Sequence, residues 1–215
     1  MKRVLVTGGN GQLARCLNDV VNSLTEYEFI FASSSDLNIT NKAQINSFFD
    51  QNSFSYCINC AAYTAVDKAE EESERAFKVN ATGADNLAKV CEEKDVILVH
   101  ISTDFVFDGE QACSYEESDI TNPINVYGAS KLKGEQLIQE NLRQYFILRT
   151  SWLYSEYGAN FLKTMLRLGN EKEELNVVSD QIGSPTYAKD LARAILKIIE
   201  VDSKDYGIYQ RMQKI

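Results

Sequence analysis

Tyr127 and Lys131 are the two residues whose types and spacing most favour chemistry in this sequence. They stand four positions apart, so on a helix they lie on one face, about a turn apart. A cation beside a phenol favours the phenolate, so we expect Lys131 to lower the pKa of Tyr127 from its usual ~10. A tyrosine tuned in this way can transfer a proton near neutral pH. Alone the pair is weak evidence, because the same spacing occurs on ordinary solvated helices.

A glycine-rich turn near the N-terminus predicts a nucleotide site. The apolar run Arg3–Val6 is typical of a buried strand, and Gly8 and Gly11 follow it. Apolar residues then recur at helical spacing from Leu13. Glycines here allow the backbone to approach a phosphate closely, and the helix N-terminus supplies N–H donors. The spacing Gly8-x-x-Gly11-x-x-Ala14 differs from the commoner G-x-G-x-x-G, and a plain turn between a strand and a helix is the alternative.

Composition limits the class of protein. The chain has 215 residues, 44% of them apolar and 25% charged, as expected for a globular domain with a sizeable core. No apolar stretch approaches the ~18 residues of a transmembrane helix. The first residues form too short an apolar run for a signal peptide, so we expect a cytoplasmic protein. The net charge of −9 argues against nucleic acid or an anionic membrane as a partner.

The five cysteines are expected to be reduced thiols, because the number is odd and the chain has cytoplasmic features. Cys57 and Cys60 have the spacing of metal ligands, but no second pair exists and His100 is the only histidine. In a strand, residues three apart point to opposite faces. We therefore predict two core residues here, and no metal.

Strand-like runs alternate with helical patterns along the chain. The expected strands are Val4–Thr7, Tyr27–Ala32, Tyr56–Asn59, Val96–Ser102, Phe146–Thr150 and Leu175–Val178. The expected helices are Gln12–Ser23, Lys42–Gln51, Ser73–Lys94, Val126–Asn141, Phe161–Gly169 and Ala188–Ile199. Pro123, after Asn122, has the pattern of a capped first helical turn.

This alternation predicts an α/β fold, a doubly wound and mostly parallel sheet of the Rossmann type with helices on both faces. We expect a dinucleotide-binding domain over residues 1–150. Residues 151–215 are expected to form a small, partial substrate-binding lobe that is interleaved with the sheet.

Polar residues follow successive strands of the predicted sheet. Asn59–Ala62 follows the third strand, Ser102–Asp104 the fourth and Arg149–Trp152 the fifth. Dinucleotides bind such sheets beyond the carboxyl ends of the strands. A hydroxyl at Thr103 could bond a substrate oxygen alongside Tyr127. Asn80 lies in the middle of an expected helix, where the alternative to a place in the site is a core amide bonded to backbone.

These motifs together resemble the extended short-chain dehydrogenase/reductase superfamily, and the finer ones look closest to the dTDP-4-dehydrorhamnose reductase family. The resemblance is carried by Gly8/Gly11/Ala14, Ala61–Glu70, Ser102–Phe107, Asn125–Gly128, Arg149–Trp152 and Asp180–Thr186. It runs from about Lys2 to about Tyr209.

The resemblance implies NADPH- or NADH-dependent reduction of the C4 ketone of dTDP-4-dehydro-L-rhamnose, a nucleotide-sugar. The product would be dTDP-L-rhamnose, used for cell-surface polysaccharide. It implies that Tyr127 protonates the alkoxide, that Lys131 tunes Tyr127 and holds the ribose, and that Thr103 orients the carbonyl. The implied cofactor contacts are Gly8, Gly11, Gln12, Leu13, Asp36, Leu37, Cys60, Ala61, Ala62, Tyr127 and Lys131. The implied contacts to the nucleotide-sugar are Thr103, Asp104 and Trp152.

Two departures from the family pattern matter. Family members usually continue beyond the strand-like Gly207–Tyr209, so we expect an apparently truncated lobe that handles the sugar nucleotide poorly. Some members also pair through magnesium held by carboxylates, one of them just after the glycine loop. Cys16 stands at about that place, so we predict no metal and leave a homodimer open. Ala32–Ser35 carries neither an acidic residue nor an arginine, and so does not choose between NADH and NADPH.

Two alternative functions stay open. One is another sugar-nucleotide epimerase or dehydratase, although dehydratases place an acidic pair after the threonine and here Asp104 is followed by Phe105. The other is a non-catalytic NAD(P)-binding regulatory subunit resembling that of methionine adenosyltransferase. The set of Tyr127, Lys131 and Thr103 argues against it.

Overall fold

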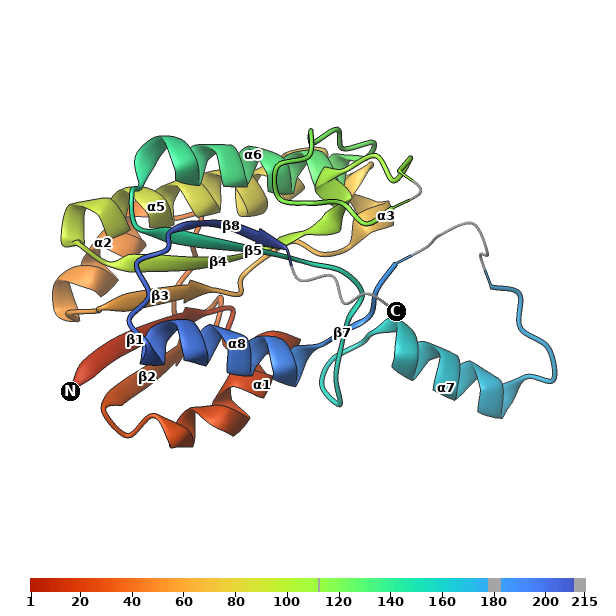
Figure 1. The fold of residues 1–215 in the computed structure, drawn as a ribbon, viewed down its shortest axis with the longest axis horizontal. Helices are drawn as coiled ribbons and strands as arrows, with labels where there is room; N and C mark the ends of the chain where they lie inside the picture. Colours follow the sequence, from red (N-terminus) through yellow and green to blue (C-terminus); the bar gives the residue numbers. More distant parts are fainter. Residues whose placement is uncertain (112, 178–182, 211–215) are drawn as a thin grey trace.

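A six-stranded parallel sheet forms the centre of the computed structural model, which describes residues 1–111, 113–177 and 183–210 (Figure 1). The strands are β1 (Lys2–Thr7), β2 (Tyr27–Ala32), β3 (Tyr56–Asn59), β4 (Ile97–Thr103), β5 (Tyr145–Thr150) and β8 (Gly207–Gln210). Their order is β2-β1-β3-β4-β5-β8, with every neighbouring pair parallel. The predicted Rossmann-type sheet is confirmed, and the strand expected at Gly207–Tyr209 pairs with β5.

Helices cover both faces of the sheet (Figure 1). One face carries α2 (Lys42–Gln51), α5 (Gly83–Lys94) and α6 (Val126–Asn141), and the other carries α1 (Gln12–Val20) and α8 (Ala188–Glu200). Because side chains alternate across a strand, Val4 and Val6 pack toward α1 and α8 while Leu5 packs toward α2 and α5. Apolar residues on both faces explain why these strands read as continuous apolar runs.

The helix expected over Ser73–Lys94 is interrupted by a π-helical turn. The short α3 (Val66–Ala69) comes first, and α4 (Ser73–Phe77), the π-helical turn Lys78–Thr82 and α5 then follow without a break. Such turns bulge a helix and occur often near functional sites. Here the bulge brings the backbone of Asn80 against α6, where a Cβ on Gly134 would lie 2.3 Å from the Asn80 oxygen.

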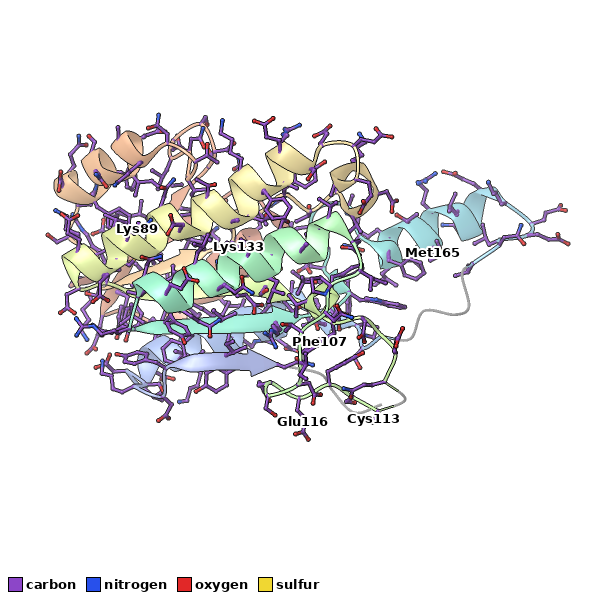
Figure 2. All side chains as sticks on the ribbon, turned by 90° about the horizontal axis from the view of Figure 1, so that it is seen from above. Lys89, Phe107, Cys113, Glu116, Lys133 and Met165 are labelled. Carbon is purple, nitrogen blue, oxygen red and sulfur yellow. The ribbon has the colours of Figure 1, made fainter. Side chains whose placement is uncertain are left out.

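Residues between β5 and α8 leave the main sheet. They form β6 (Leu153–Tyr154) and β7 (Thr186–Tyr187), which pair with each other, and α7 (Phe161–Glu171). Helix α7 projects from the carboxyl end of the sheet (Figure 1), and Figure 2 shows it, with Met165, extending beyond the body of the molecule. None of its residues is buried.

Two local predictions are wrong. Residues 175–177 form no strand, because Leu175 and Val177 are exposed and no described strand pairs with them; Val178 lies outside the described residues. Helix α6 begins at Val126 and not at Pro123, since Oδ1 of Asn125 caps it by accepting from the Gly128 N–H at 2.7 Å. In the described part of the chain, no helix is long and apolar enough to cross a membrane.

Candidate active site

The glycine loop is shaped to approach a ligand closely. Gly8 has φ +64°, and a Cβ there would lie 2.8 Å from the Ala61 nitrogen, so only glycine fits where this loop meets the loop after β3. Gly11 stands immediately before α1 as its N-cap residue and supplies no side-chain cap. The first N–H groups of α1 therefore keep their capacity to bind an anion. This arrangement fits the pyrophosphate of a dinucleotide.

Gln12 and Leu13 have side chains engaged elsewhere. Gln12 donates from Nε2 to the Leu153 carbonyl at 3.0 Å, and its Oε1 accepts from Asn160 at 2.8 Å. Leu13 is buried in the core between the sheet and α1. The backbone groups of these two residues remain for the predicted cofactor contact.

Asp36 and Leu37 lie in the turn after β2. The Ala32 carbonyl accepts from the Gly9 N–H at 2.8 Å, which holds this turn beside the glycine loop. Asp36 is exposed, and its Oδ2 accepts from the Ser33 hydroxyl at 2.5 Å and the Ser33 N–H at 2.9 Å. These bonds lower the pKa of Asp36. The side chain of Leu37 is buried in the core, so only its backbone is left for a ligand.

The loop after β3 is held by Asn80. Its Oδ1 accepts from the Tyr63 N–H at 2.8 Å, and its Nδ2 donates to the Tyr63 carbonyl at 3.0 Å. Of the two alternatives left open for Asn80, the structure shows the buried amide bonded to backbone. The predicted cofactor contacts Cys60, Ala61 and Ala62 are thereby fixed next to Gly8, and burial raises the pKa of the Cys60 thiol.

Thr103, Asp104 and Tyr127 form one contiguous group at the carboxyl end of β4. Thr103 donates to Oδ1 of Asp104 at 3.1 Å, and it is also close enough to the side chain of Tyr127 to influence the pKa of that phenol. Burial raises the pKa of Asp104, and it raises the pKa of Tyr127 to about 12. A hydroxyl pair at this edge of the sheet can bind a carbonyl oxygen and give it a proton.

The expected lowering of the Tyr127 pKa by Lys131 is wrong in this structure. Nζ of Lys131 donates to the Ile101 carbonyl at 2.6 Å and lies 3.2 Å from Nε2 of His100. Desolvation therefore decides the pKa of Tyr127. Lys131 is itself only 2% exposed, and burial lowers its pKa to about 8.

A buried ion pair sits beneath the site and fixes α6 on the sheet. Arg149 of β5 donates to Glu135 of α6 through Nη2 at 2.7 Å and Nε at 3.1 Å, and Ser102 of β4 also bonds Glu135. Because α6 carries Tyr127 and Lys131, the ion pair between Arg149 and Glu135 fixes the position of α6, and with it these two residues, relative to the carboxyl ends of the strands. Sequence reasoning missed Glu135, although it stands four residues after Lys131 and so on the same helical face.

Trp152 packs against residues of the segment between β5 and α8. It adopts φ +45°, which is a strained conformation for a bulky residue, and it is 38% exposed. Its ring centroid lies 5.7 Å from that of Phe161, and a Cβ on Gly183 would lie 2.8 Å from it. Trp152 thus belongs with the segment that carries α7.

His100 is a second buried site residue that sequence reasoning missed, after Glu135. Its Nδ1 lies 3.0 Å from Nδ2 of Asn59, and its Nε2 faces Lys131. A single titratable residue inside the apolar run Val96–Ser102 was the available signal. All five cysteines are free thiols. Among the described residues, no group of three or more His, Cys, Asp or Glu side chains could hold a metal ion.

Comparison with known proteins identifies relatives of this chain. A family model described as the RmlD substrate binding domain matches residues 1–212. A dTDP-4-dehydrorhamnose reductase from Aggregatibacter actinomycetemcomitans is 44% identical over 97% of this chain and 72% of its own length. The spore coat polysaccharide biosynthesis protein SpsK of Bacillus subtilis is 41% identical over 97% of this chain and 72% of its own length.

A solved structure agrees with these relatives. The dTDP-4-dehydrorhamnose reductase of Bacillus anthracis, in complex with NADP, is 46% identical with a TM-score of 0.95, covering 100% of this chain and 75% of that one. A UDP-glucose 4-epimerase from Brucella ovis shares the fold alone, at 19% identity and a TM-score of 0.82. Because the family model covers nearly the whole sequence, this chain belongs to the RmlD substrate binding domain family.

Proposed function

We propose that this chain is an NADPH- or NADH-dependent oxidoreductase that reduces the C4 ketone of dTDP-4-dehydro-L-rhamnose to dTDP-L-rhamnose. The observation that carries the proposal is the contiguous group of Thr103, Asp104 and Tyr127 at the carboxyl end of β4, with Lys131 one turn further along α6. The names of relatives that are 44–46% identical support the substrate.

The residues present fit a nicotinamide dinucleotide. Gly8 leaves no room for a Cβ, and the uncapped start of α1 offers N–H groups to an anion. We propose that the backbone N–H groups of Gln12 and Leu13 hold the pyrophosphate. Gly11, whose own N–H donates to the Gly8 carbonyl at 2.8 Å, would let the pyrophosphate approach the loop closely. Asp36 and Leu37 would border the adenosine ribose, and Cys60–Ala62 would line the opposite side. The bound cofactor would supply the hydride.

The chain's own residues supply orientation and the proton. We propose that Thr103 binds the C4 carbonyl oxygen, and that Tyr127 gives its phenolic proton to that oxygen as negative charge develops on it. Because Tyr127 holds its proton with a pKa of about 12, it enters the reaction as an acid. Lys131 holds the cofactor ribose, and Asp104 and Trp152 contact the nucleotide-sugar.

The test is loss of reduced-cofactor absorbance when the wild-type chain is mixed with dTDP-4-dehydro-L-rhamnose, with the dTDP-L-rhamnose product identified by mass. We expect turnover by the wild type and a large loss in Tyr127→Phe. Cofactor binding without any turnover would contradict the proposal and favour the non-catalytic regulatory reading. Conversion to an isomer without net cofactor oxidation would favour an epimerase.

The organisation of the chain follows the same proposal. Residues 1–150 would form the dinucleotide-binding domain and residues 151–215 a substrate-binding lobe. The return of α8 and β8 to the main sheet supports an interleaved arrangement. A net charge of −9 and five free thiols support a cytoplasmic protein without nucleic acid as a partner. A homodimer would show as twice the chain mass in light scattering.

A further inference from the structure

A chain of buried polar side chains crosses the sheet and ends on Lys131. The hydroxyl of Thr7 on β1 donates to Oδ1 of Asn59 on β3 at 2.6 Å. Nδ2 of Asn59 lies 3.0 Å from Nδ1 of His100 on β4, and Nε2 of His100 lies 3.2 Å from Nζ of Lys131 on α6. All four residues are at most 2% exposed, so the protein alone decides where their protons lie.

The orientation of the Asn59 amide is fixed by a backbone group. The Ala61 N–H can only donate, and it lies 3.2 Å from the side-chain atom of Asn59 that the Thr7 hydroxyl also contacts. That atom must be the amide oxygen, so the amide nitrogen faces His100. Nδ1 of His100 therefore accepts a hydrogen bond and carries no proton. A neutral imidazole in this position carries its proton on Nε2.

The Nε2–H of His100 then points at Nζ of Lys131, which is itself a hydrogen-bond donor. Nζ of Lys131 donates to the Ile101 carbonyl at 2.6 Å. An ammonium has three donors and no acceptor, whereas an uncharged amine has a lone pair that can accept from Nε2–H. We propose that His100 is a positioning residue for this active site: fixed by Asn59 as the Nε2–H tautomer, it presents an N–H to Nζ of Lys131 and favours the uncharged amine.

The other groups around Nζ do not remove this bias. Glu135 on α6 favours the charged lysine, but its carboxylate is already bonded by Arg149 and Ser102. The Cys60 thiol after β3 stays protonated because burial raises its pKa, and Tyr127, one turn earlier on α6, also keeps its proton. Among the described residues, no carboxylate hydrogen-bonds Nζ.

The catalytic meaning of this arrangement rests on the proposed function, whereas the tautomer and the charge of Lys131 are properties of the free chain. A lysine that exchanges its proton near neutral pH can respond to what binds beside Tyr127. Absence of reductase turnover would overturn the proposed function and leave the measurements below unchanged.

The first measurement is the ¹⁵N spectrum of the wild-type chain labelled at histidine. His100 is the only histidine, so the two ring nitrogens give unambiguous signals. We expect a protonated Nε2 and an unprotonated Nδ1 across neutral pH, with no conversion to the cation near 6.5. A proton on Nδ1, or titration near the ordinary histidine pKa, would overturn the proposal.

The second measurement is the pKa of Lys131, followed by ¹³C labelling at lysine Cε, with Lys131→Met used to assign its signal. His100→Leu removes the N–H donor, and we expect the Lys131 pKa to rise by about one unit. His100→Gln is the matched control, because its amide can accept from Asn59 and donate to Nζ; it should keep the wild-type value. An unchanged or lower pKa in His100→Leu contradicts the proposal. If His100→Leu does not fold, the wild-type tautomer decides.

Discussion

Tyr127 is the side chain on which the proposed reaction depends, and its surroundings keep it protonated. It lies against Phe105, with ring centroids 5.6 Å apart, and near Thr103 in a site that burial has made poorly solvated. A phenol with a pKa of about 12 is protonated at neutral pH and so has a proton to give. Reduction of a ketone needs an acid in this position, because the carbonyl oxygen becomes an alkoxide.

Removing the Tyr127 hydroxyl should lower the reaction rate without changing the affinity for the cofactor. We expect Tyr127→Phe to keep the fold and the cofactor Kd, because it deletes one hydroxyl, and to lower kcat by about 10²–10⁴. Lys131→Met should weaken cofactor binding as well as the rate, because the proposal has Lys131 hold the cofactor ribose beside the reacting centre. The measurement is kcat with the nucleotide-sugar and Kd by calorimetric titration of NADPH for both variants. Retention of more than half of the wild-type kcat in Tyr127→Phe would exclude it as the proton donor.

Among the elements, α6 and the π-helical turn Lys78–Thr82 have the tightest contact. A Cβ at Gly134 would lie 2.3 Å from the Asn80 carbonyl oxygen, a backbone atom that moves only if a helix moves. We expect Gly134→Ala to lower the free energy of unfolding by about 1–3 kcal/mol. Thermal or urea unfolding measures this change.

Gly169 is the matched control, because it also lies inside a helix but has nothing within 4 Å of its Cβ position apart from its chain neighbours and the backbone of its own helix. Gly169→Ala should stabilise the chain by about 0.5–1 kcal/mol through helix propensity alone. If both alanine variants were stabilised equally, the close approach of α6 to the π-helical turn would be refuted.

The turn after β2 makes a prediction about the cofactor. Ser33–Ser35 is uncharged, and the carboxylate of the next residue, Asp36, is engaged by Ser33. We expect the Kd values of NADH and NADPH to agree within about tenfold, or ~1.4 kcal/mol. Calorimetry on both cofactors decides this, and a hundredfold preference in either direction would show that Asp36 or another group reads the 2′ position.

Most elements could be predicted from the sequence, and the exceptions have physical causes. Strands buried on both faces gave unmistakable apolar runs, and α6 follows the expected bounds Val126–Asn141. The run at Leu175 failed because strand formation needs a pairing partner, which a local pattern does not reveal. The π-helical turn could not be predicted either, because no hydrophobic period in the sequence distinguishes it from the helices on either side.

Sequence motifs could predict which residues lie at the site, but not how their side chains are oriented there. Strand ends and the glycine loop located Thr103 and Gly8, since parallel strands bring their carboxyl ends to one edge. The direction of Nζ of Lys131 depends on His100 and on the Ile101 carbonyl, which lie about thirty residues away in the chain. Tertiary packing thus reversed the expected shift of the Tyr127 pKa.

For the whole molecule, the buried His100 predicts a specific response to acid. Burial and the nearby Lys131 hold the pKa of His100 well below 6.5 in the folded chain, whereas the unfolded chain titrates near 6.5. Below that pH the unfolded state binds a proton that the folded state refuses, so stability falls as the pH falls, by at most about 1.4 kcal/mol per pH unit from this group.

Urea unfolding at several pH values between neutral and acid measures the slope, and His100→Gln is the comparison. We expect the variant to lose less stability than the wild type on acidification, since glutamine does not titrate. Equal slopes in the two proteins would mean that the folded chain protonates His100 as readily as the unfolded chain does.

Gln12 joins two parts of the molecule that the proposed reaction must bring together. The residue that opens α1, where an anion is expected, is bonded to Leu153 and Asn160 at the base of the segment carrying α7. The two events are then thermodynamically linked. If ordering of that segment raises the affinity for the dinucleotide by some factor, dinucleotide binding shifts the equilibrium toward the ordered segment by the same factor. Binding of the dinucleotide at the N-terminus of α1 would thus make α7 more rigid, although α7 contributes no atom to the glycine loop.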